Sequence, residues 1–186
     1  MIIYLLLVYL LRFQTDAKKE CRRYPVDKMQ PFRYVSLSAS SPQVYVEILA
    51  QPDQLDAGAS GQIFIGYTGK KTSANQNLPH SKCVAIKIYR EGNEREFRNG
   101  VTILNNLKND EMSKKHIIDM LDYGVVINDR EHLTILELGD MSFEQELHRA
   151  KTQRSRDELK RLIKDLLNPL VVLHKTAVHL DFKPKI

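Results

Sequence analysis

The chain has few of the features that identify the most recognisable protein classes. Its 186 residues include two cysteines, no tryptophan and no evident internal repeat. Cys21 and Cys83 lack the spacing of a metal site, and two cysteines make no disulfide framework, so we expect a reducing compartment.

An apolar run long enough to cross a membrane is also absent. Residues 1–13 are almost entirely apolar, but as a helix they would span about 20 Å, against the roughly 30 Å of a bilayer core. No basic stretch precedes this run and no small-residue cleavage site follows it, as a secretory signal requires. We expect a cytoplasmic protein. Weak contact with an anionic membrane, a docked strand or helix, and an incorrectly placed start codon stay open for this segment.

The basic residues are not concentrated as a nucleic-acid footprint would require. Lys and Arg outnumber Asp and Glu by 28 to 23, a net charge of +5, and they are scattered apart from one cluster within residues 18–23. We interpret them as a solvated surface and expect no nucleic-acid partner. A hydrophobic content of 42% and a charged content of 27% allow a packed core, in one ordinary domain or a small domain with a tail.

Segments with strand composition follow a polar stretch. Residues 14–43 are rich in serine and proline and are interpreted as a linker. Strand composition then occurs at five places: 44–49, 62–67, 83–89, 123–127 and 133–138. The last two are separated by a polar break and should pair as a hairpin.

Helical spacing begins after Gly92. An apolar stripe there consists of Phe97, Val101, Leu104 and Leu107. A short helix is expected around residues 143–150, and a long one over 155–173, where a capping box precedes a leucine pattern that Pro169 interrupts. Strands first and helices afterwards predict the α+β class.

Four short motifs carry chemical information, and each also has an ordinary structural explanation. Gly58-Ala59-Ser60-Gly61 can bring backbone N–H groups close to a phosphate, or can be a plain turn. Lys87, at the end of Val84-Ala85-Ile86-Lys87, can offset phosphate charge, or can be a surface lysine. Residues 133–139 form a leucine-rich strand. A dinucleotide-binding loop is set aside because a strand, not a helix, follows the glycines.

The fourth motif is His179-Leu180-Asp181-Phe182-Lys183-Pro184, five residues after Leu173-His174. In order and spacing, the four motifs together resemble the signature set of eukaryotic-type protein kinases, Ser/Thr kinase-like. The resemblance covers residues 44–186. It implies a protein-kinase-like small lobe over 44–138, with a five-stranded antiparallel sheet plus one helix. Residues 139–186 would be the hinge and the start of an incomplete helical large lobe. Residues 1–13, outside the resemblance, form a separate apolar N-terminal segment.

The resemblance also implies the roles of individual residues. Asp181 would accept the proton of the substrate hydroxyl, and Lys183 would neutralise charge on the transferred phosphoryl group. Leu136 would be the gatekeeper. The ATP-binding residues would be Leu55, Gly58, Ser60, Gly61, Ile63, Ala85, Lys87, Glu137 and Gly139.

Several positions depart from the kinase pattern. Asp56 replaces the first glycine of the loop, and Leu180 replaces the usual arginine. Gly100 stands where the helix glutamate that holds the lysine belongs, and Glu96, one turn earlier on the same face, is the candidate substitute. Ile186 stands at the position of a metal-binding asparagine and cannot ligate Mg²⁺, so we expect no metal ligands although the family uses Mg²⁺ with ATP.

Two functions follow as expectations. The first is an ATP-binding, protein kinase-like Ser/Thr phosphotransferase acting on a protein substrate. The motif ends at Ile186, before the family's metal-binding Asp and activation segment, so the chain as given should be inactive. Its last helix would then expose Leu162, Leu166 and Leu173. The second is a non-catalytic, pseudokinase-like module that binds a partner protein, with or without nucleotide.

Overall fold

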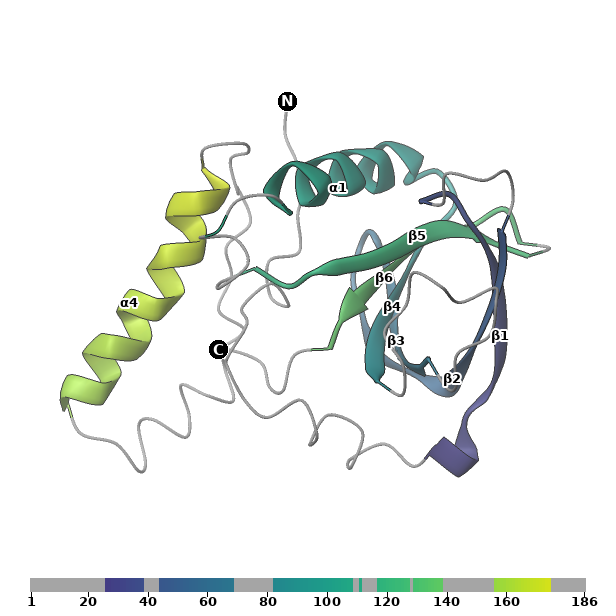
Figure 1. The fold of residues 1–186 in the computed structure, drawn as a ribbon, viewed down its shortest axis with the longest axis horizontal. Helices are drawn as coiled ribbons and strands as arrows, with labels where there is room; N and C mark the ends of the chain where they lie inside the picture. Colours follow the sequence, from purple (N-terminus) through teal and green to yellow (C-terminus); the bar gives the residue numbers. More distant parts are fainter. Residues whose placement is uncertain are drawn as a thin grey trace. The chain divides into compact units, whose positions relative to one another are not determined.

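The computed structural model describes residues 26–38, 44–68, 82–108, 111, 117–127, 129–138 and 156–174. Its elements, in chain order, are η3 (Val26–Lys28), β1 (Gln30–Ser36), β2 (Val44–Ala57), β3 (Gly61–Tyr67), β4 (Cys83–Tyr89), α1 (Glu94–Leu107), β5 (Met120–Val126), β6 (His132–Glu137) and α4 (Arg156–Leu173) (Figure 1). The chain divides into two compact units, and the strands belong to the unit made of residues 15–101 and 120–138.

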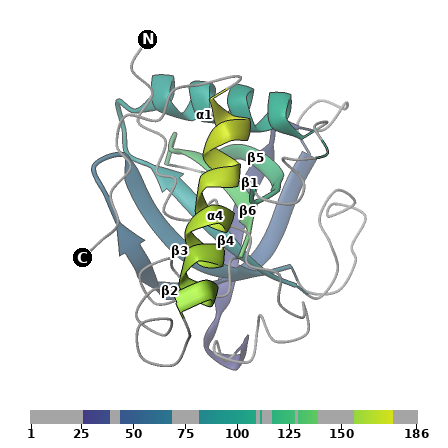
Figure 2. The same ribbon diagram turned by 90° about the vertical axis from the view of Figure 1, so that its left-hand side faces the viewer.

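The six strands form a closed antiparallel barrel in the order β1-β2-β3-β4-β6-β5 (Figures 1 and 2). The barrel closes because β1 pairs with β2 along its whole length and also with β5, from Tyr34↔Val126 to Ser36↔Gly124. Closure leaves no unpaired sheet edge, so each strand can satisfy backbone groups on both sides.

The expected kinase-like small lobe, a five-stranded antiparallel sheet plus one helix, followed by an incomplete helical large lobe, is therefore wrong. The difference arises at β1, which lies within the segment interpreted as a polar linker. Phe32, Tyr34 and Ser36 alternate with exposed or half-buried residues along this strand. On the outer side, Arg33 Nε lies 2.5 Å from Glu47 Oε2 on β2. The added strand turns a sheet into a barrel.

Most of the other predicted elements are confirmed. β3, β4 and the β5–β6 hairpin match four of the predicted strands, and β2 contains the fifth and continues to Ala57. α1 buries the whole predicted stripe of Phe97, Val101, Leu104 and Leu107. The short helix expected around residues 143–150 and the N-terminal segment 1–13 lie outside the described residues.

α4 confirms the long predicted helix and runs through Pro169 without a break. The expectation that Leu173 is exposed is wrong, since this side chain is 1% exposed, while Leu162 and Leu166 lie outside the described side chains. The exposed apolar residues of α4 are instead Ile163, Leu167 and Val171. In the described part of the chain, no helix is long and apolar enough to cross a membrane.

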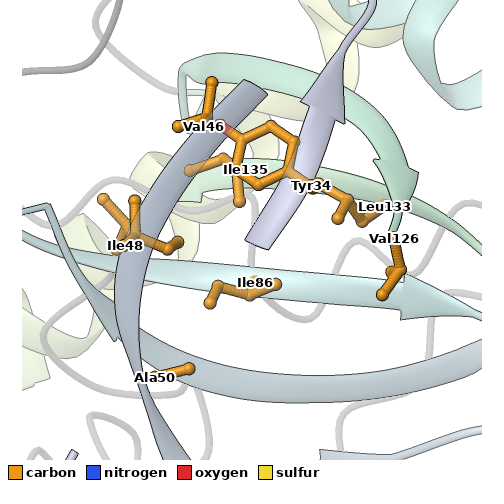
Figure 3. Close-up of a cluster of buried hydrophobic side chains, with 9 residues drawn as sticks. Tyr34, Val46, Ile48, Ala50, Ile86, Val126, Leu133 and Ile135 are labelled. Carbon is orange, nitrogen blue, oxygen red and sulfur yellow. The ribbon is translucent and has the colours of Figure 1, made fainter. Parts of the chain in front are cut away.

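The barrel interior is filled by apolar side chains that alternate along each strand. This cluster consists of Tyr34, Val46, Ile48, Ala50, Val84, Ile86, Val126, Leu133 and Ile135 (Figure 3). Strands expose their side chains to opposite faces in turn, so the residues between these ones point out of the barrel. The side chains that neighbour these interior residues along β4 and β6, and their cross-strand partners on β3, therefore lie on an outer face.

One polar cluster is buried where β1 meets β5. The Asp122 carboxylate is 2% exposed and accepts hydrogen bonds from Tyr34 Oη at 2.7 Å, Ser36 Oγ at 2.8 Å and the Tyr123 backbone N–H at 2.8 Å, as well as from Ser38 Oγ. Burial, together with the Asp122 charge, raises the pKa of Tyr34 well above its usual range, so the phenol keeps its proton and donates. These bonds tie β1 to β5 and offset the cost of burying a charge.

Gly124 is required at the same strand contact. A Cβ at this position would lie 2.1 Å from the Val35 backbone oxygen, which belongs to β1. Replacing Gly124 with alanine should lower the free energy of unfolding by about 3 kcal/mol, because the two strands would have to separate. Urea unfolding followed by circular dichroism measures this. Gly66→Ala is the matched control, since its Cβ would meet side-chain atoms of Ile86 and Val84 and no backbone atom. Equal losses in the two variants would contradict the assignment.

Candidate functional site

Lys87 lies in the middle of a face formed by three neighbouring strands. On β4 it pairs with Ile63 of β3 and with Thr134 of β6. Ala85, two residues before it, pairs with Ile65 and Leu136. Because cross-strand partners point to the same side of a sheet, these side chains share one face. We call this the outer face of the barrel: Ile63, Ile65, Ala85, Lys87, Thr134 and Leu136.

The structure thus brings together three predicted ATP-binding residues, Ile63, Ala85 and Lys87, with the predicted gatekeeper Leu136. Ile63, Ala85 and Leu136 are 6%, 5% and 8% exposed, so the apolar part of the outer face is covered. Glu137 pairs with Val84 at the end of β6. Gly139, Asp181 and Lys183, like Leu180 and Ile186, lie outside the described residues.

The ammonium group of Lys87 is in an unusual environment. Burial lowers the pKa of Lys87 to about 8, and attraction by Glu96 opposes that change. The Nζ atom lies 4.4 Å from the centroid of the Tyr89 ring, a cation–π contact. Keeping a half-buried cation in a folded protein costs free energy. Perturbed pKa values such as that of Lys87 are common at binding and catalytic sites.

Glu96 is the acidic residue of α1 whose charge acts on Lys87. Glu96 attracts Lys87, and its Oε2 is buried without a hydrogen-bond partner. In the described residues, the two groups are not joined by an ion pair. A Cβ at Gly100 would lie 3.3 Å from Tyr89 Oη, so a longer side chain there would press on the tyrosine. The tyrosine that contacts Lys87 thus accounts for a glycine at the expected glutamate position.

An aromatic cluster positions the first turns of α1 against the barrel. The Phe97 ring packs edge-on to Tyr89 at 5.5 Å and lies 4.5 Å from the His132 ring, centroid to centroid. Gly92, with a φ of 87°, turns the chain into the helix, and Glu94 in the first turn favours the helix dipole. Glu96 is adjacent to Phe97 in the chain, so this packing holds the helical turn that carries Glu96.

The glycine turn is held closed by its own hydrogen bonds. The Gly58 N–H donates to the Gly61 oxygen at 2.9 Å, and the Arg90 N–H donates to the Ser60 oxygen at 3.2 Å. The Ser60 hydroxyl is buried and has no hydrogen-bond partner. A Cβ at Gly61 would lie 2.1 Å from the Ile88 oxygen, so close strand approach explains this glycine. Leu55, the remaining turn residue of the prediction, is 41% exposed on β2.

Tyr89 and Thr134 are site residues that sequence reasoning missed. Burial raises the pKa of Tyr89 to about 12, the nearby Thr134 hydroxyl opposes this change, and the Glu96 charge adds to it. The phenol therefore stays neutral beside Lys87. The spacing of Tyr89, two residues after Lys87 on the same strand face, was the signal that could have found it.

The lowered pKa of Lys87 predicts that the stability of the fold depends on pH. Its pKa is lowered on folding, so the unfolded chain holds more protons above pH 8 and stability rises with pH. The free energy of unfolding should gain about 2 kcal/mol from about pH 7.5 to about pH 9.5. Above that range, ionisation of Tyr34 and Tyr89 in the unfolded chain reverses the trend. Urea titrations at several pH values measure the slope. Lys87→Met should remove it, and an unchanged slope would contradict the lowered pKa.

The sequence predicts no metal ligands and cysteines in a reducing compartment. Across the described ranges, no group of His, Cys, Asp or Glu is arranged to hold a metal ion. Cys83, at the start of β4, is disulfide-bonded, which differs from the expectation of cysteines in a reducing compartment.

Comparison with known proteins leaves the chain without a family assignment. No model of a known protein family matches it, and no curated protein matches it. The resemblance to protein kinases is therefore a hypothesis that depends on the motifs and on the surroundings of Lys87.

Proposed function

We propose that this chain binds ATP on the outer face of the barrel, with Lys87 contacting the phosphates. The observation that carries the proposal is the half-buried Lys87 ammonium beside the apolar residues Ile63 and Ala85. An ammonium can offset phosphate charge, and an apolar strand face suits a purine ring.

The order of residues on the outer face supports one orientation of the nucleotide. Gly61 pairs with Tyr89, so the glycine turn lies toward the Lys87 end. Leu136 and Glu137 pair with Ala85 and Val84, toward the other end. The triphosphate would lie at the first end, and adenine at the second, where the resemblance places backbone hydrogen bonds from Glu137.

Phosphoryl transfer to a Ser or Thr hydroxyl is the reaction that the resemblance adds. In that reaction, Asp181 accepts the hydroxyl proton and Lys183 offsets charge on the transferred group. No metal ligand is assigned, because Ile186 stands where the family has its metal-binding asparagine. Transfer from radiolabelled ATP to a Ser/Thr peptide, lost in Asp181→Asn while ATP binding is kept, would support this step.

A second candidate is a non-catalytic module that binds a partner protein. The low exposure of Ile63, Ala85 and Leu136 favours it, because a nucleotide must displace whatever covers them. The Tyr89 contact and the Glu96 charge also leave Lys87 partly neutralised without a ligand.

Isothermal titration with ATP and with adenosine, both without metal, distinguishes the two candidates. Nucleotide binding predicts that ATP binds more tightly than adenosine and that its affinity falls as Lys87 loses its proton above about pH 8. An interaction module that binds no nucleotide predicts no heat from either ligand over the whole pH range.

A further inference from the structure

The inside of the barrel contains a second candidate site, independent of Lys87. A cavity of about 170 Å³ opens at the end of the barrel where β1 begins. We call this site the barrel mouth; its lining residues are Gln30, Pro31, Phe32, Ala50, Gln51, Pro52, Phe64, Ile86 and Ile88. Ile86 and Ala50 point into the space that the strands enclose (Figure 3).

Small residues and a strand irregularity account for the cavity. Ala50 on β2 pairs with Gly66 on β3, so little side-chain volume fills the interior between these strands. The register then shifts, and the next pairing is Gln54 with Phe64. The extra residues of β2 carry Gln51 and Pro52 to the rim. A β-bulge bends the strand that carries it, and bulges are frequent at barrel rims.

The two ends of the barrel interior differ in chemistry. The end near Ser36 is polar, because the Asp122 carboxylate there accepts hydrogen bonds from the hydroxyl groups of Tyr34 and Ser36. The barrel mouth has aromatic and aliphatic walls, from Phe32, Phe64 and Ile88, with amide side chains at Gln30 and Gln51. A water molecule inside would find few polar partners on the walls, and apolar cavities of about 150 Å³ are known to stay dry and to accept benzene. The rim amides can donate or accept one hydrogen bond to a substituent.

We propose that the barrel mouth binds a small molecule with a single ring and one hydrogen-bonding group. The ring contacts Phe32, Phe64 and Ile88, and the polar group faces Gln51 at the rim. Mouths of β-barrels are common ligand sites, lined mainly by apolar side chains with a few polar groups that fix orientation. The site lies inside the barrel, whereas Lys87 lies on the outer face, so neither proposal depends on the other.

Titration of the full chain with phenol and with toluene, followed by nitrogen-15 amide spectra, tests the proposal. Both should give saturable shifts at residues of the barrel mouth, with phenol about fivefold tighter, the value of one net hydrogen bond. Ala50→Leu fills the cavity and should weaken both probes at least about tenfold. Gln51→Leu should remove the preference for phenol and keep toluene binding.

Tyr45→Leu is the matched control, because Tyr45 is an exposed side chain of the same strand, 61% exposed, and its replacement should leave both affinities unchanged. If Ala50→Leu does not fold, Ile88→Phe narrows the cavity from β4 and carries the same expectation. The absence of saturable shifts, shifts confined to other surfaces, or unchanged affinities in the filled variant would each overturn the proposal.

Discussion

Replacing Asp122 with alanine should lower the free energy of unfolding by about 4 kcal/mol, one of the largest effects expected of any single change in the barrel. Tyr34 and Ser36 are 0% and 3% exposed and both donate to this carboxylate. Without it, two buried hydroxyl groups lose their acceptor, and each costs about 1–3 kcal/mol. The strand contact that closes the barrel would be weakened at the same time, because β1 and β5 share only three residue pairs.

Urea unfolding at neutral pH, followed by circular dichroism, measures this loss. Asp122→Asn keeps the shape and one acceptor oxygen, so it should lose less than the alanine variant. Asp129→Ala removes an exposed carboxylate after β5 and should change stability by less than about 0.5 kcal/mol. A loss under about 1 kcal/mol in Asp122→Ala would mean that the hydroxyl cluster does not hold β1 in place.

A second large effect is expected for nucleotide affinity. Lys87→Met should weaken ATP binding about 30-fold, the usual value of one charged hydrogen bond, about 2 kcal/mol. Methionine keeps most of the side-chain volume and removes a cation whose pKa burial has lowered to about 8. The variant should therefore be at least as stable as the parent chain near neutral pH, so lost binding would not reflect unfolding.

Two further variants make this prediction specific. Lys82→Met, which removes a half-buried lysine just before β4, should leave ATP affinity within about twofold. Glu96→Gln removes the charge that attracts Lys87 and should lower the lysine pKa further, shifting the loss of ATP affinity to lower pH. Equal ATP affinity in Lys87→Met and the parent chain would exclude Lys87 from the nucleotide site.

The strands and helices that follow residue 44 were predictable because their patterns are local. Val84-Ala85-Ile86 and the stripe from Phe97 to Leu107 each show the period of one element, and each element formed as expected. The barrel was not predicted, because its closure depends on β1, whose alternation of Phe32 and Tyr34 with Arg33 is short and follows Pro31. Proline at the start of a strand is tolerated, so it did not exclude a strand there.

The candidate site was predictable only in part. Lys87 and Ala85 stood out through a motif, and Glu96 through helical spacing. Thr134 takes its role from cross-strand pairing with Lys87, which no local pattern reveals. The same holds for Asp122, since its partner Tyr34 is 88 residues away in the chain. An acidic residue in an apolar strand indicates a buried partner without naming it.

The central claim, that Lys87 is the phosphate-binding cation, is tested most directly by its own titration. Chains labelled with carbon-13 at lysine Cε, with Lys87→Met to assign the signal, give the lysine pKa from the chemical shift. The proposal predicts titration near pH 8 without ligand and at least about one pH unit higher with saturating ATP, because phosphate stabilises the charged form. A Lys87 signal whose titration is the same with and without ATP would contradict it.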